Sequence, residues 1–263
     1  MVFQLDSREN PKVKHFIRLL NNGKYREEQG LFAIEGARLC MDALQSGIPI
    51  AELFYTEEAA KKYNTIVADL GQKALKTYQI SEGIAKKMGD TTHPQGVFCT
   101  CKTLDKPDDL VTIGTDSRIL AMENIQDPAN LGAMLRTAEA VGIKGVICSA
   151  GCCDMYHPKV LRASMGAVFR LSVRLEENLP KMLRGLTGMG VLTMAAVPDA
   201  SACPVTSLRF DRSAVAVIGN EGNGLTKEAI EACEVRVTIP MKGRAESLNA
   251  SMAAGILMWE MLR

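Results

Sequence analysis

The sequence predicts an α/β protein whose second half carries a mostly parallel, six-stranded sheet, preceded by a smaller α/β domain. Two observations lead to this prediction. Short apolar runs alternate with helical stretches along residues 118–263, which is typical of a parallel sheet covered by helices on both faces. The composition, 47% hydrophobic and 23% charged, is that of an ordinary globular protein with a sizeable core.

Six apolar runs in the second half are expected to be strands: residues 118–125, 145–150, 168–175, 191–197, 214–220 and 235–240. Helices are expected between most of them, at residues 130–141, 158–165, 179–186 and 226–233. A last helix is expected from Ser247, whose hydroxyl is placed to cap it. Apolar residues at intervals of three or four predict the buried face of this helix: Leu248, Met252, Ile256, Trp259 and Leu262.

The first hundred residues also mix strands with helices. Strands are expected at residues 31–36, 52–56 and 96–102, and a helix at residues 37–47. The stretch at residues 105–117 is rich in turn formers and acids and is therefore the expected linker. We expect two domains, residues 1–108 and residues 116–263.

The charge distribution excludes one class of nucleic-acid binder and leaves another open. The net charge of +1 excludes a strongly basic protein of the histone kind. Six Lys or Arg residues nevertheless lie between Arg8 and Arg26, with Glu9 as the one acid among them. Such a cluster is a candidate surface for phosphates, although a solvated helix face explains the same pattern.

The apolar runs, the cysteines and the histidines bear on three questions: membrane insertion, cellular compartment and metal binding. No signal-peptide core and no apolar run of membrane-spanning length is present, so we expect no membrane segment. The eight cysteines form no C-x-x-C pair and sit mostly in apolar runs, which indicates reduced thiols and a cytoplasmic protein. The three histidines lack metal-ligand spacing, so we expect no metal site.

The first of three unusual segments is NIQDPANLGAMLRTAEAVG, at residues 124–142. A strand ends at Asn124, Pro128 stops further pairing, and Asn130 can cap the helix that follows. Asn130 and Arg136 can both face a ligand held beyond the strand end. A capped helix that carries a surface arginine explains this segment equally well.

The second segment, VIGNEGNGLT at residues 217–226, takes a strand through a glycine-rich turn into a helix. Such turns bind ligands through exposed backbone N–H groups. The glycine order is G-x-x-G-x-G rather than the dinucleotide G-x-G-x-x-G, and Met241 stands where an acid for a ribose would be expected. A Rossmann dehydrogenase is therefore disfavoured, and Glu221 in the turn is the candidate functional acid.

The third segment, IPMKGRAESLNASMAAGILMW at residues 239–259, places polar residues at the start of an apolar helix. Together and in this order, the three segments resemble the signature motifs of the SpoU/TrmH family of RNA ribose 2′-O-methyltransferases, in the SPOUT superfamily. The matching residues are Asn124, Asp127, Pro128, Asn130, Gly132, Arg136, Thr137 and Ala138, then Gly219, Glu221 and Gly224, then Ile239, Pro240, Met241, Gly243, Ser247, Leu248 and Asn249.

The resemblance extends over most of the chain. Residues 159–171, which include Arg162, resemble the family's segment between the first two motifs, although Ser172 stands where a proline is common. The stretches SRENPKVKHFIRLL and FAIEGARL are similar to the ribosomal-protein-like substrate-binding domain of many members. The resemblance thus implies an RNA-binding domain at residues 1–108 and a methyltransferase domain with a C-terminal trefoil knot at residues 116–263.

The resemblance also implies a cofactor and a division of labour. S-adenosylmethionine would be held, largely through backbone groups, by Gly219, Gly224, Ile239, Met241, Leu248 and Asn249. The reacting centre would comprise Arg136, Asn130, Glu221, Ser247 and Asn249. Because arginine is always protonated, we interpret Arg136 as a clamp on RNA phosphate and a stabiliser of the developing alkoxide rather than as a base. The hydroxyl proton could then leave through phosphate or water, and Glu221 would orient either Arg136 or the ribose.

The expected partners are RNA and a second copy of the chain. RNA contacts are expected from Arg8, Lys12, Lys14, Arg18 and Arg162. The resemblance implies a homodimer through the knotted domain, for which Met252, Met258, Trp259 and Met261 are candidate contacts, although a buried core helix explains the same residues.

The extra first domain favours ribosomal RNA, of the 23S class, over transfer RNA as the substrate. Three alternatives remain: a tRNA ribose methyltransferase, a non-catalytic RNA-binding assembly factor on the same fold, and a base methyltransferase of another SPOUT branch. The last is disfavoured because such enzymes usually lack the Ser-Leu-Asn arrangement found at Ser247, Leu248 and Asn249.

Overall fold

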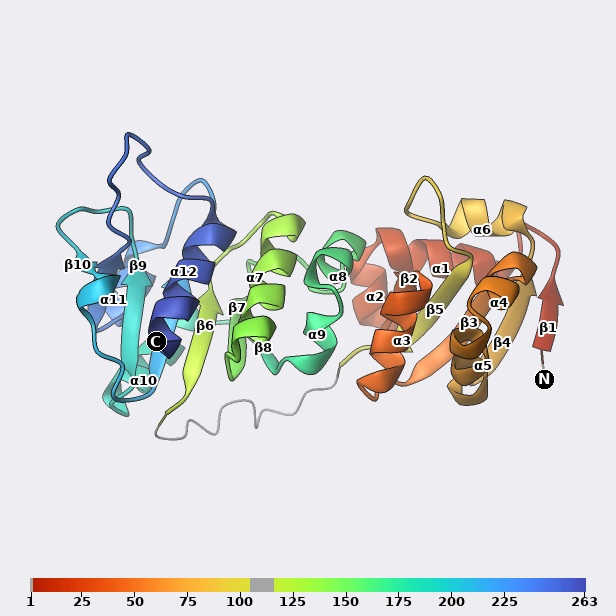
Figure 1. Ribbon diagram of the computed structural model, residues 1–263, viewed down its shortest axis with the longest axis horizontal. Coiled ribbons are helices and arrows are strands. Elements are labelled where there is room, and N and C mark those ends of the chain that lie inside the picture. The colour runs from red at the N-terminus through yellow and green to blue at the C-terminus, as the bar shows by residue number, and fades with distance from the viewer. Residues whose placement is uncertain (1, 105–115) are drawn as a thin grey trace. The chain divides into compact units, whose positions relative to one another are not determined.

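A computed structural model describes residues 2–104 and 116–263 (Figure 1). Contacts divide the chain into two compact units. Unit 1 comprises Met1–Asp105 with Tyr156–Phe169, and unit 2 comprises Lys106–Met155 with Arg170–Arg263. The expected linker lies outside the described residues except for Asp116 and Ser117, so the predicted domain boundary stays a prediction.

Unit 1 contains a mixed five-stranded sheet in the order β1-β4-β3-β5-β2, in which β5 runs antiparallel to β3 and β2. Its strands are β1 (Val2–Leu5), β2 (Leu31–Glu35), β3 (Ile50–Thr56), β4 (Lys76–Ile80) and β5 (Val97–Lys102). Its helices are α1 (Pro11–Asn21), α2 (Gly23–Gln29), α3 (Ala37–Gln45), α4 (Glu57–Lys62), α5 (Asn64–Lys73), α6 (Glu82–Met88), α8 (Pro158–Ser164) and all but the last residue of α9 (Ala167–Arg170). The three predicted strands and the predicted helix of the first hundred residues are confirmed.

Helix α1 illustrates how the sequence of unit 1 sorts its two faces. Asn10 caps the helix by accepting a hydrogen bond from the backbone of Lys12, and its apolar residues recur at helical spacing. Phe16 is fully buried, with its ring centroid 5.8 Å from that of Phe54 and 5.6 Å from that of Phe98. The cations of α1 are thereby left on its outer side.

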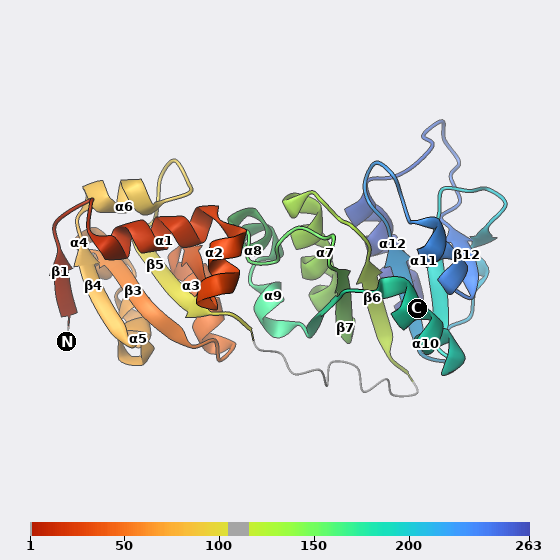
Figure 2. The same ribbon diagram turned by 180° about the vertical axis from the view of Figure 1, so that it is seen from behind.

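Unit 2 contains an entirely parallel sheet in the order β10-β12-β9-β11-β6-β7-β8. Figure 2 labels three of its strands, β6, β7 and β12. Its strands are β6 (Arg118–Met122), β7 (Gly145–Ser149), β8 (Val173–Glu176), β9 (Leu192–Ala196), β10 (Cys203–Pro204), β11 (Ala214–Ile218) and β12 (Val235–Thr238). Its helices are α7 (Pro128–Val141), α10 (Leu179–Gly188), η2 (Val205–Ser207), α11 (Lys227–Ala232) and α12 (Ala250–Leu262). Helices α10 and α11 cover one face, and α7 and α12 lie on the other.

The predicted α/β class and parallel sheet are confirmed, with two differences in the strands. The sheet has seven strands rather than six because the two-residue β10, too short to leave a pattern, pairs with β12. The strand predicted at residues 168–175 is wrong in its first half: residues 167–170 form helix α9, and β8 begins at Val173. A short buried apolar run does not distinguish a helix from a strand by periodicity.

The buried face predicted for the last helix is also wrong. Met252 is 61% exposed and Trp259 is 63% exposed, whereas Leu257 and Met258 on the other side are fully buried. Helix α12 packs against α7, β6 and β11 through this second face. Because the helix is apolar all round, spacings of three and four occur on both sides and cannot select the packed one.

Strand order and helix packing do not determine how the last segment threads, so the trefoil knot stays a prediction. None of the helices in residues 2–104 and 116–263 combines the length and apolar character that a bilayer crossing requires. All eight cysteines lie among the described residues, and all are free thiols.

Candidate active site

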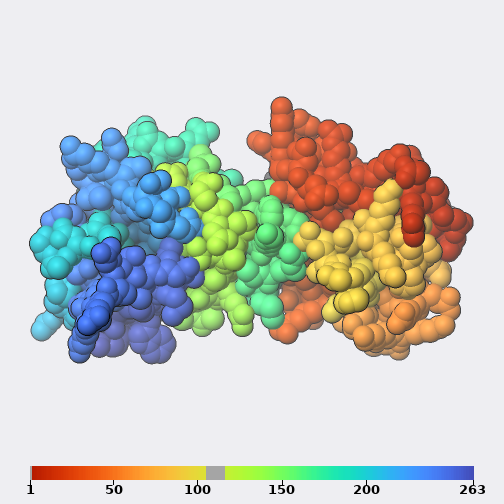
Figure 3. Space-filling model, turned by 90° about the horizontal axis from the view of Figure 1, so that it is seen from above, coloured from red at the N-terminus to blue at the C-terminus, as the bar shows by residue number. Residues whose placement is uncertain are grey.

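The three unusual segments follow β6, β11 and β12 and lie at one edge of the unit 2 sheet. Strand β11 pairs with β6 on one side and with β9 on the other, and β9 pairs with β12. Because all these strands are parallel, the segments that leave their carboxyl ends meet at a shared edge, where ligands bind in open α/β sheets. Figure 3 looks onto this edge, with the residues after β11 in light blue beside the darker blue residues that lead into α12.

The turn after β11 is folded by Asn220, a residue that the sequence analysis did not single out. Its backbone exchanges two hydrogen bonds with Gly224, of 3.0 and 2.9 Å. Its side-chain oxygen accepts from the N–H groups of Gly222 and Asn223, both at 3.0 Å. Its amide nitrogen donates to the carbonyl oxygen of Asn124 at 2.8 Å and so ties the turn to the end of β6.

Gly219 is required by the close approach of the chain to itself in this turn. A Cβ atom at this position would lie 2.2 Å from the carbonyl carbon of Gly224 and 2.3 Å from the nitrogen of Leu225. Gly224 has a φ of 69°, in the left-handed region that favours glycine. The turn therefore requires glycine at Gly219 and at Gly224, two of the three glycines in the G-x-x-G-x-G pattern.

Glu123, another residue missed from the sequence, holds the exit of the turn. It is 4% exposed and accepts hydrogen bonds from the backbone nitrogen of Thr226 at 2.8 Å and from its hydroxyl at 2.7 Å. Thr226 in turn caps helix α11. Glu123 comes directly after β6, and residues at the ends of these parallel strands lie at the same sheet edge as the turn. This position is the signal that could have identified Glu123 from the sequence.

A chain of hydrogen bonds joins the three segments through their side chains. Glu221 accepts from the amide of Asn130 at 3.1 Å, and Asn130 accepts from the amide of Asn249 at 2.9 Å. Glu221 also accepts from the backbone nitrogens of Gln126 and Asp127, both at 3.1 Å. Burial alone would raise the pKa of Glu221, but the hydrogen bonds from Asn130 and these backbone groups lower it below its usual value.

The start of α7 differs from the prediction in its cap. Asp127, not Asn130, caps the helix by accepting from the backbone nitrogen of Ala129 at 2.9 Å, and Pro128 occupies the first helical position. Asn130 lies inside the helix and is 7% exposed. Its burial explains why both polar ends of its amide are engaged, since an unpaired buried amide is costly.

The start of α12 differs in the same way. Asn249, not Ser247, is the cap, and its side-chain oxygen accepts from the backbone nitrogens of Ser251 at 2.9 Å and Met252 at 3.3 Å. Ser247 is exposed and has no hydrogen-bond partner among the residues that the structure describes. Its hydroxyl is therefore available to a ligand.

Two adjoining cavities lie at this edge. The first, which we call the polar cavity, has a volume of about 740 Å³ and is lined by Gln126, Asp127, Asn130, Asn220, Glu221, Gly222, Ser247, Leu248, Asn249 and Ala250. The second, which we call the apolar cavity, has a volume of about 700 Å³ and is lined chiefly by Ala196, Val197 and Pro198 and by residues 218–225, 237–241 and 245–248. Glu221, Ser247 and Leu248 are among the residues that line both.

The structure brings most of the predicted site residues together. Five of the predicted cofactor-binding residues line the apolar cavity: Gly219, Gly224, Ile239, Met241 and Leu248. Asn249, the sixth, lines the polar cavity with three predicted catalytic residues: Asn130, Glu221 and Ser247. Ala196, Val197 and Pro198, at the end of β9, also line the apolar cavity but were not predicted. The sequence does not reveal that β9 lies beside β11.

Arg136 stands apart from the others. It lines neither cavity, is exposed, and makes no hydrogen bond or ion pair within the described part of the chain. Six residues along a helix correspond to a turn of about 240° from Asn130, so the two side chains point in different directions. No hydrogen bond or ion pair joins Arg136 to Glu221 in the described part of the chain, so the prediction that Glu221 orients Arg136 has no structural support. Glu221 is instead hydrogen-bonded to the backbone at the start of α7.

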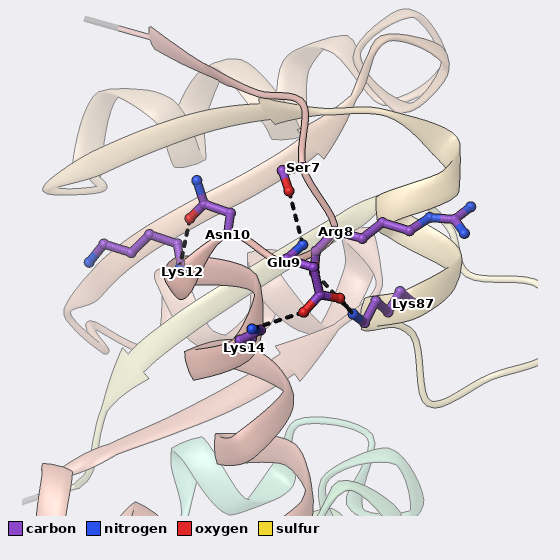
Figure 4. A network of polar contacts seen from close by, with 7 residues as sticks. All are labelled: Ser7, Arg8, Glu9, Asn10, Lys12, Lys14 and Lys87. Atoms are coloured by element: carbon purple, nitrogen blue, oxygen red, sulfur yellow. Dashed lines mark hydrogen bonds and ion pairs between the residues drawn. The ribbon is translucent and has the colours of Figure 1, made fainter.

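The predicted RNA-binding cations of unit 1 are mostly paired already (Figure 4). Glu9 accepts from Lys14 at 2.8 Å and from Lys87 at 2.7 Å. These two hydrogen bonds lower the pKa of Glu9 to about 2. Lys12 forms an ion pair with Glu52, which is 7% exposed. Lys12 is therefore the partner of a buried carboxylate rather than a free surface cation.

The remaining predicted cations have varied surroundings. The guanidinium of Arg18 lies 4.0 Å from the ring centroid of Tyr25, and that of Arg162 forms an ion pair with Asp90. The side chain of Arg8 extends away from Glu9. Arg26 of the same sequence cluster is buried and donates to the carbonyl oxygens of Leu19 and Leu20. Within residues 2–104 and 116–263, no group of three or more His, Cys, Asp or Glu residues has the arrangement of a metal site.

Comparison with known families matches both parts of the chain. The SpoU rRNA Methylase family matches residues 117–259, and the MRM3-like substrate binding domain matches residues 10–99. The chain is 30% identical to the 23S rRNA (guanosine(2553)-2′-O)-methyltransferase RlmP of Bacillus subtilis, with 98% of each chain covered. It is 33% identical to an uncharacterized tRNA/rRNA methyltransferase of Synechocystis, covering 100% of this chain and 94% of that protein.

Solved structures agree in fold. The AdoMet-bound rRNA methyltransferase of Sinorhizobium meliloti superposes with a TM-score of 0.88 and 28% identity, covering 99% of this chain and 97% of that one. The predicted smaller α/β domain that precedes the parallel sheet is thus confirmed together with the predicted family. The chain belongs to the SpoU rRNA methylase family.

Proposed function

We propose that this protein transfers the methyl group of S-adenosylmethionine to a ribose 2′-hydroxyl of ribosomal RNA, of the 23S class. The observation that carries the proposal is the hydrogen-bonded chain Glu221–Asn130–Asn249, which joins the three segments at one sheet edge beside two adjoining cavities. The relative from Bacillus subtilis, named as a 23S rRNA 2′-O-methyltransferase, supports the choice of reaction and substrate.

The apolar cavity fits S-adenosylmethionine in size and chemistry. Its volume of about 700 Å³ lies within the usual range for small-molecule sites. Ile239, Met241 and Leu248 offer apolar surface to an adenosyl group, and the turn beside Gly219 offers backbone groups. The Sinorhizobium meliloti rRNA methyltransferase, whose solved structure is AdoMet-bound, supports this assignment. When bound, S-adenosylmethionine supplies a methyl group on a positively charged sulfur.

The polar cavity is proposed to receive the ribose. Ser247, whose hydroxyl has no partner in the described chain, is available to hydrogen-bond it, while Asn130 and Asn249 fix the shape of the wall. Arg136, exposed and unpaired among the described residues, is proposed to clamp an RNA phosphate. Most of the catalysis would then come from positioning.

We also propose that residues 1–108 bind RNA and that residues 116–263 carry the knotted methyltransferase domain. Arg8, Lys14 and Arg18 are the cations of α1 and its approach that remain at the surface. Because Lys14 pairs with an exposed acid, releasing it to a phosphate costs little. The eight free thiols support a reducing, cytoplasmic location.

A second copy of the chain is the proposed partner of α12. Met252, Trp259 and Leu262 form an exposed apolar face on this helix, although its other face is already packed. Sedimentation analysis of Trp259→Glu tests the homodimer: we expect the wild type to sediment as a dimer and the variant as a folded monomer. A monomeric wild type would contradict it.

Tritiated methyl transfer tests the function. Wild type and Arg136→Ala would be incubated with labelled S-adenosylmethionine and either bulk bacterial ribosomal RNA or transfer RNA. We expect alkali-resistant 2′-O-methyl dinucleotides in ribosomal RNA with the wild type and none with the variant. Label in transfer RNA alone would favour the tRNA alternative. Absence of both label and cofactor binding would favour a non-catalytic RNA-binding factor.

A further inference from the structure

Methyl transfer to a ribose hydroxyl requires an acceptor for the hydroxyl proton, and any inference about that acceptor rests on the proposed function. Arginine stays protonated in proteins, so Arg136 is unsuitable. All three histidines lie in unit 1, outside the unit that carries the two cavities. Of the described residues that line the polar cavity, only Asp127 and Glu221 have ionisable side chains. Among the side chains of this cavity, the candidate acceptors are therefore these two carboxylates.

Glu221 is committed to other bonds. Its Oε1 accepts from the nitrogen of Asp127 and from the amide of Asn130, and its Oε2 accepts from the nitrogen of Gln126. Hydrogen bonds to the charged form of a carboxylate reduce its affinity for a proton. Protonating Glu221 would also weaken these hydrogen bonds, because the neutral carboxyl group is a weaker acceptor than the carboxylate. Glu221 is thus a poor acceptor.

Asp127 is bound at one oxygen only. Its Oδ1 accepts from the nitrogen of Ala129 at 2.9 Å, whereas Oδ2 has no partner among the described residues. The side chain is exposed and lines the polar cavity together with Ser247. The oxygen without a partner can therefore take a proton while the other keeps its hydrogen bond to the backbone of Ala129.

We propose that Asp127 is a catalytic residue, the base that accepts the proton of the ribose 2′-hydroxyl in the polar cavity. The hydroxyl oxygen forms a bond to the methyl carbon, and the carbon–sulfur bond breaks with its electron pair staying on sulfur. The proton passes to Oδ2 of Asp127, and the electron pair of the O–H bond stays on the ribose oxygen. Water then removes the proton from the carboxyl group.

Two cap-preserving substitutions test the role. Asn and Ser cap helices about as well as Asp, so Asp127→Asn and Asp127→Ser keep the start of α7 while removing the carboxylate. We expect single-turnover methyl transfer to fall by on the order of 100-fold or more in both variants, because a general base typically contributes about 100- to 10,000-fold. Formate should partly restore transfer in Asp127→Ser. Affinity for S-adenosylmethionine, measured by calorimetry, should stay within about twofold because Asp127 does not line the apolar cavity.

A binding measurement gives a readout without turnover. The target nucleotide is first located with the wild type, and RNA with a 2′-deoxy substitution at that nucleotide is then compared with the unmodified RNA in the presence of S-adenosylhomocysteine. We expect the 2′-hydroxyl to strengthen binding several-fold in the wild type, with that advantage reduced in Asp127→Asn, because a hydrogen bond to a charged acceptor is stronger than one to a neutral acceptor. Asp199→Asn is the matched control, since Asp199 lies in the same unit but lines neither cavity.

The outcomes separate this proposal from the proposed function. A wild type that methylates no RNA would overturn both. An active wild type with Asp127→Asn and Asp127→Ser at full rate would overturn the role of Asp127 alone. Equal loss in Asp199→Asn, or loss in both Asp127 variants without formate rescue and with an unchanged 2′-hydroxyl advantage, would also overturn it.

Discussion

The sheet edge of unit 2 and helix α1 of unit 1, which carries Lys12, Lys14 and Arg18, differ in how their candidate functional residues are held. At the sheet edge, Asn130, Glu221 and Asn249 come from segments far apart in the sequence and bind one another directly. On helix α1, Lys12 and Lys14 lie close together in the sequence, yet each is bound to a carboxylate. Strand ends that must meet therefore identify a site more reliably than a count of like charges.

The physical reason is the range of the interactions involved. Parallel strands bring their carboxyl ends to one edge whatever their sequence separation, so a polar residue after each strand has a defined position. A cation on a helix has no such constraint and pairs with whichever acid the fold brings within reach. Glu52, which pairs with Lys12, follows it by 40 residues.

Replacing Gly219 by alanine should have the largest effect on the sheet edge. The new Cβ would lie 2.2 Å from the backbone of Gly224, so the turn must shift. We expect a loss of about 3 kcal/mol or more in unfolding free energy, the upper range for overpacking, with cofactor binding lost as well. Chemical denaturation measures the first effect. Gly222→Ala is the control for stability, because its Cβ would meet only Asn220 Oδ1 at 3.7 Å, and its unfolding free energy should match that of the wild type.

Replacing Lys12 by methionine should destabilise unit 1. Glu52 is buried, and its Oε2 already lacks a hydrogen-bond partner in the described chain, so losing Lys12 leaves an unpaired buried charge. We expect a cost of about 3 kcal/mol, since breaking a buried pair from one side is strongly destabilising. Thermal unfolding of Lys12→Met and Lys14→Met would be compared.

Lys14→Met should cost less than about 1 kcal/mol, because its partner Glu9 is exposed. It should instead weaken RNA binding and reduce the salt dependence by about one counterion. Equal stability of the two variants would show that the contrast between buried and exposed pairs does not hold.

Replacing Asn130 by alanine should disconnect the three segments. Glu221 and Asn249 each lose a hydrogen bond, and we expect a cost of about 2 kcal/mol in unfolding free energy. Arg136→Ala on the same helix should change stability by less than about 0.5 kcal/mol, because exposed residues without partners contribute little. If the two variants were equally stable, the hydrogen-bonded chain would not hold the site together.

The titration of Glu221 should give the smallest effect, a change of the unfolding free energy with pH. Its pKa in the folded protein lies below the ordinary value of 4.5, so its stabilising contribution is fully present above pH 4.5 and is lost as the pH falls through the folded value. The stability difference between wild type and Glu221→Gln should thus stay constant from pH 7 to pH 5 and shrink below that. A difference that shrinks already between pH 7 and pH 6 would contradict this prediction.

Much of the site could be predicted because its requirements are local. Gly219 and Gly224 are needed by a turn that closes within a few residues, and Asn, Asp and Pro residues after strands mark helix starts. What could not be predicted depends on distant packing. One face of α12 is exposed because α7 and β11 pack against the other face. The residues at the end of β9 line the apolar cavity because the strand order places β9 beside β11. The caps shifted by a few residues because several residues near each start can cap a helix.

We propose that the apolar cavity binds the cofactor while Arg136, outside it, acts on RNA. Calorimetric titration of S-adenosylmethionine into wild type, Gly219→Ala and Arg136→Ala tests this claim most directly. We expect Arg136→Ala to bind with the wild-type dissociation constant within about twofold, and Gly219→Ala to show affinity reduced on the order of 100-fold or no binding. Wild-type affinity in Gly219→Ala, or an equal loss in Arg136→Ala, would contradict the account.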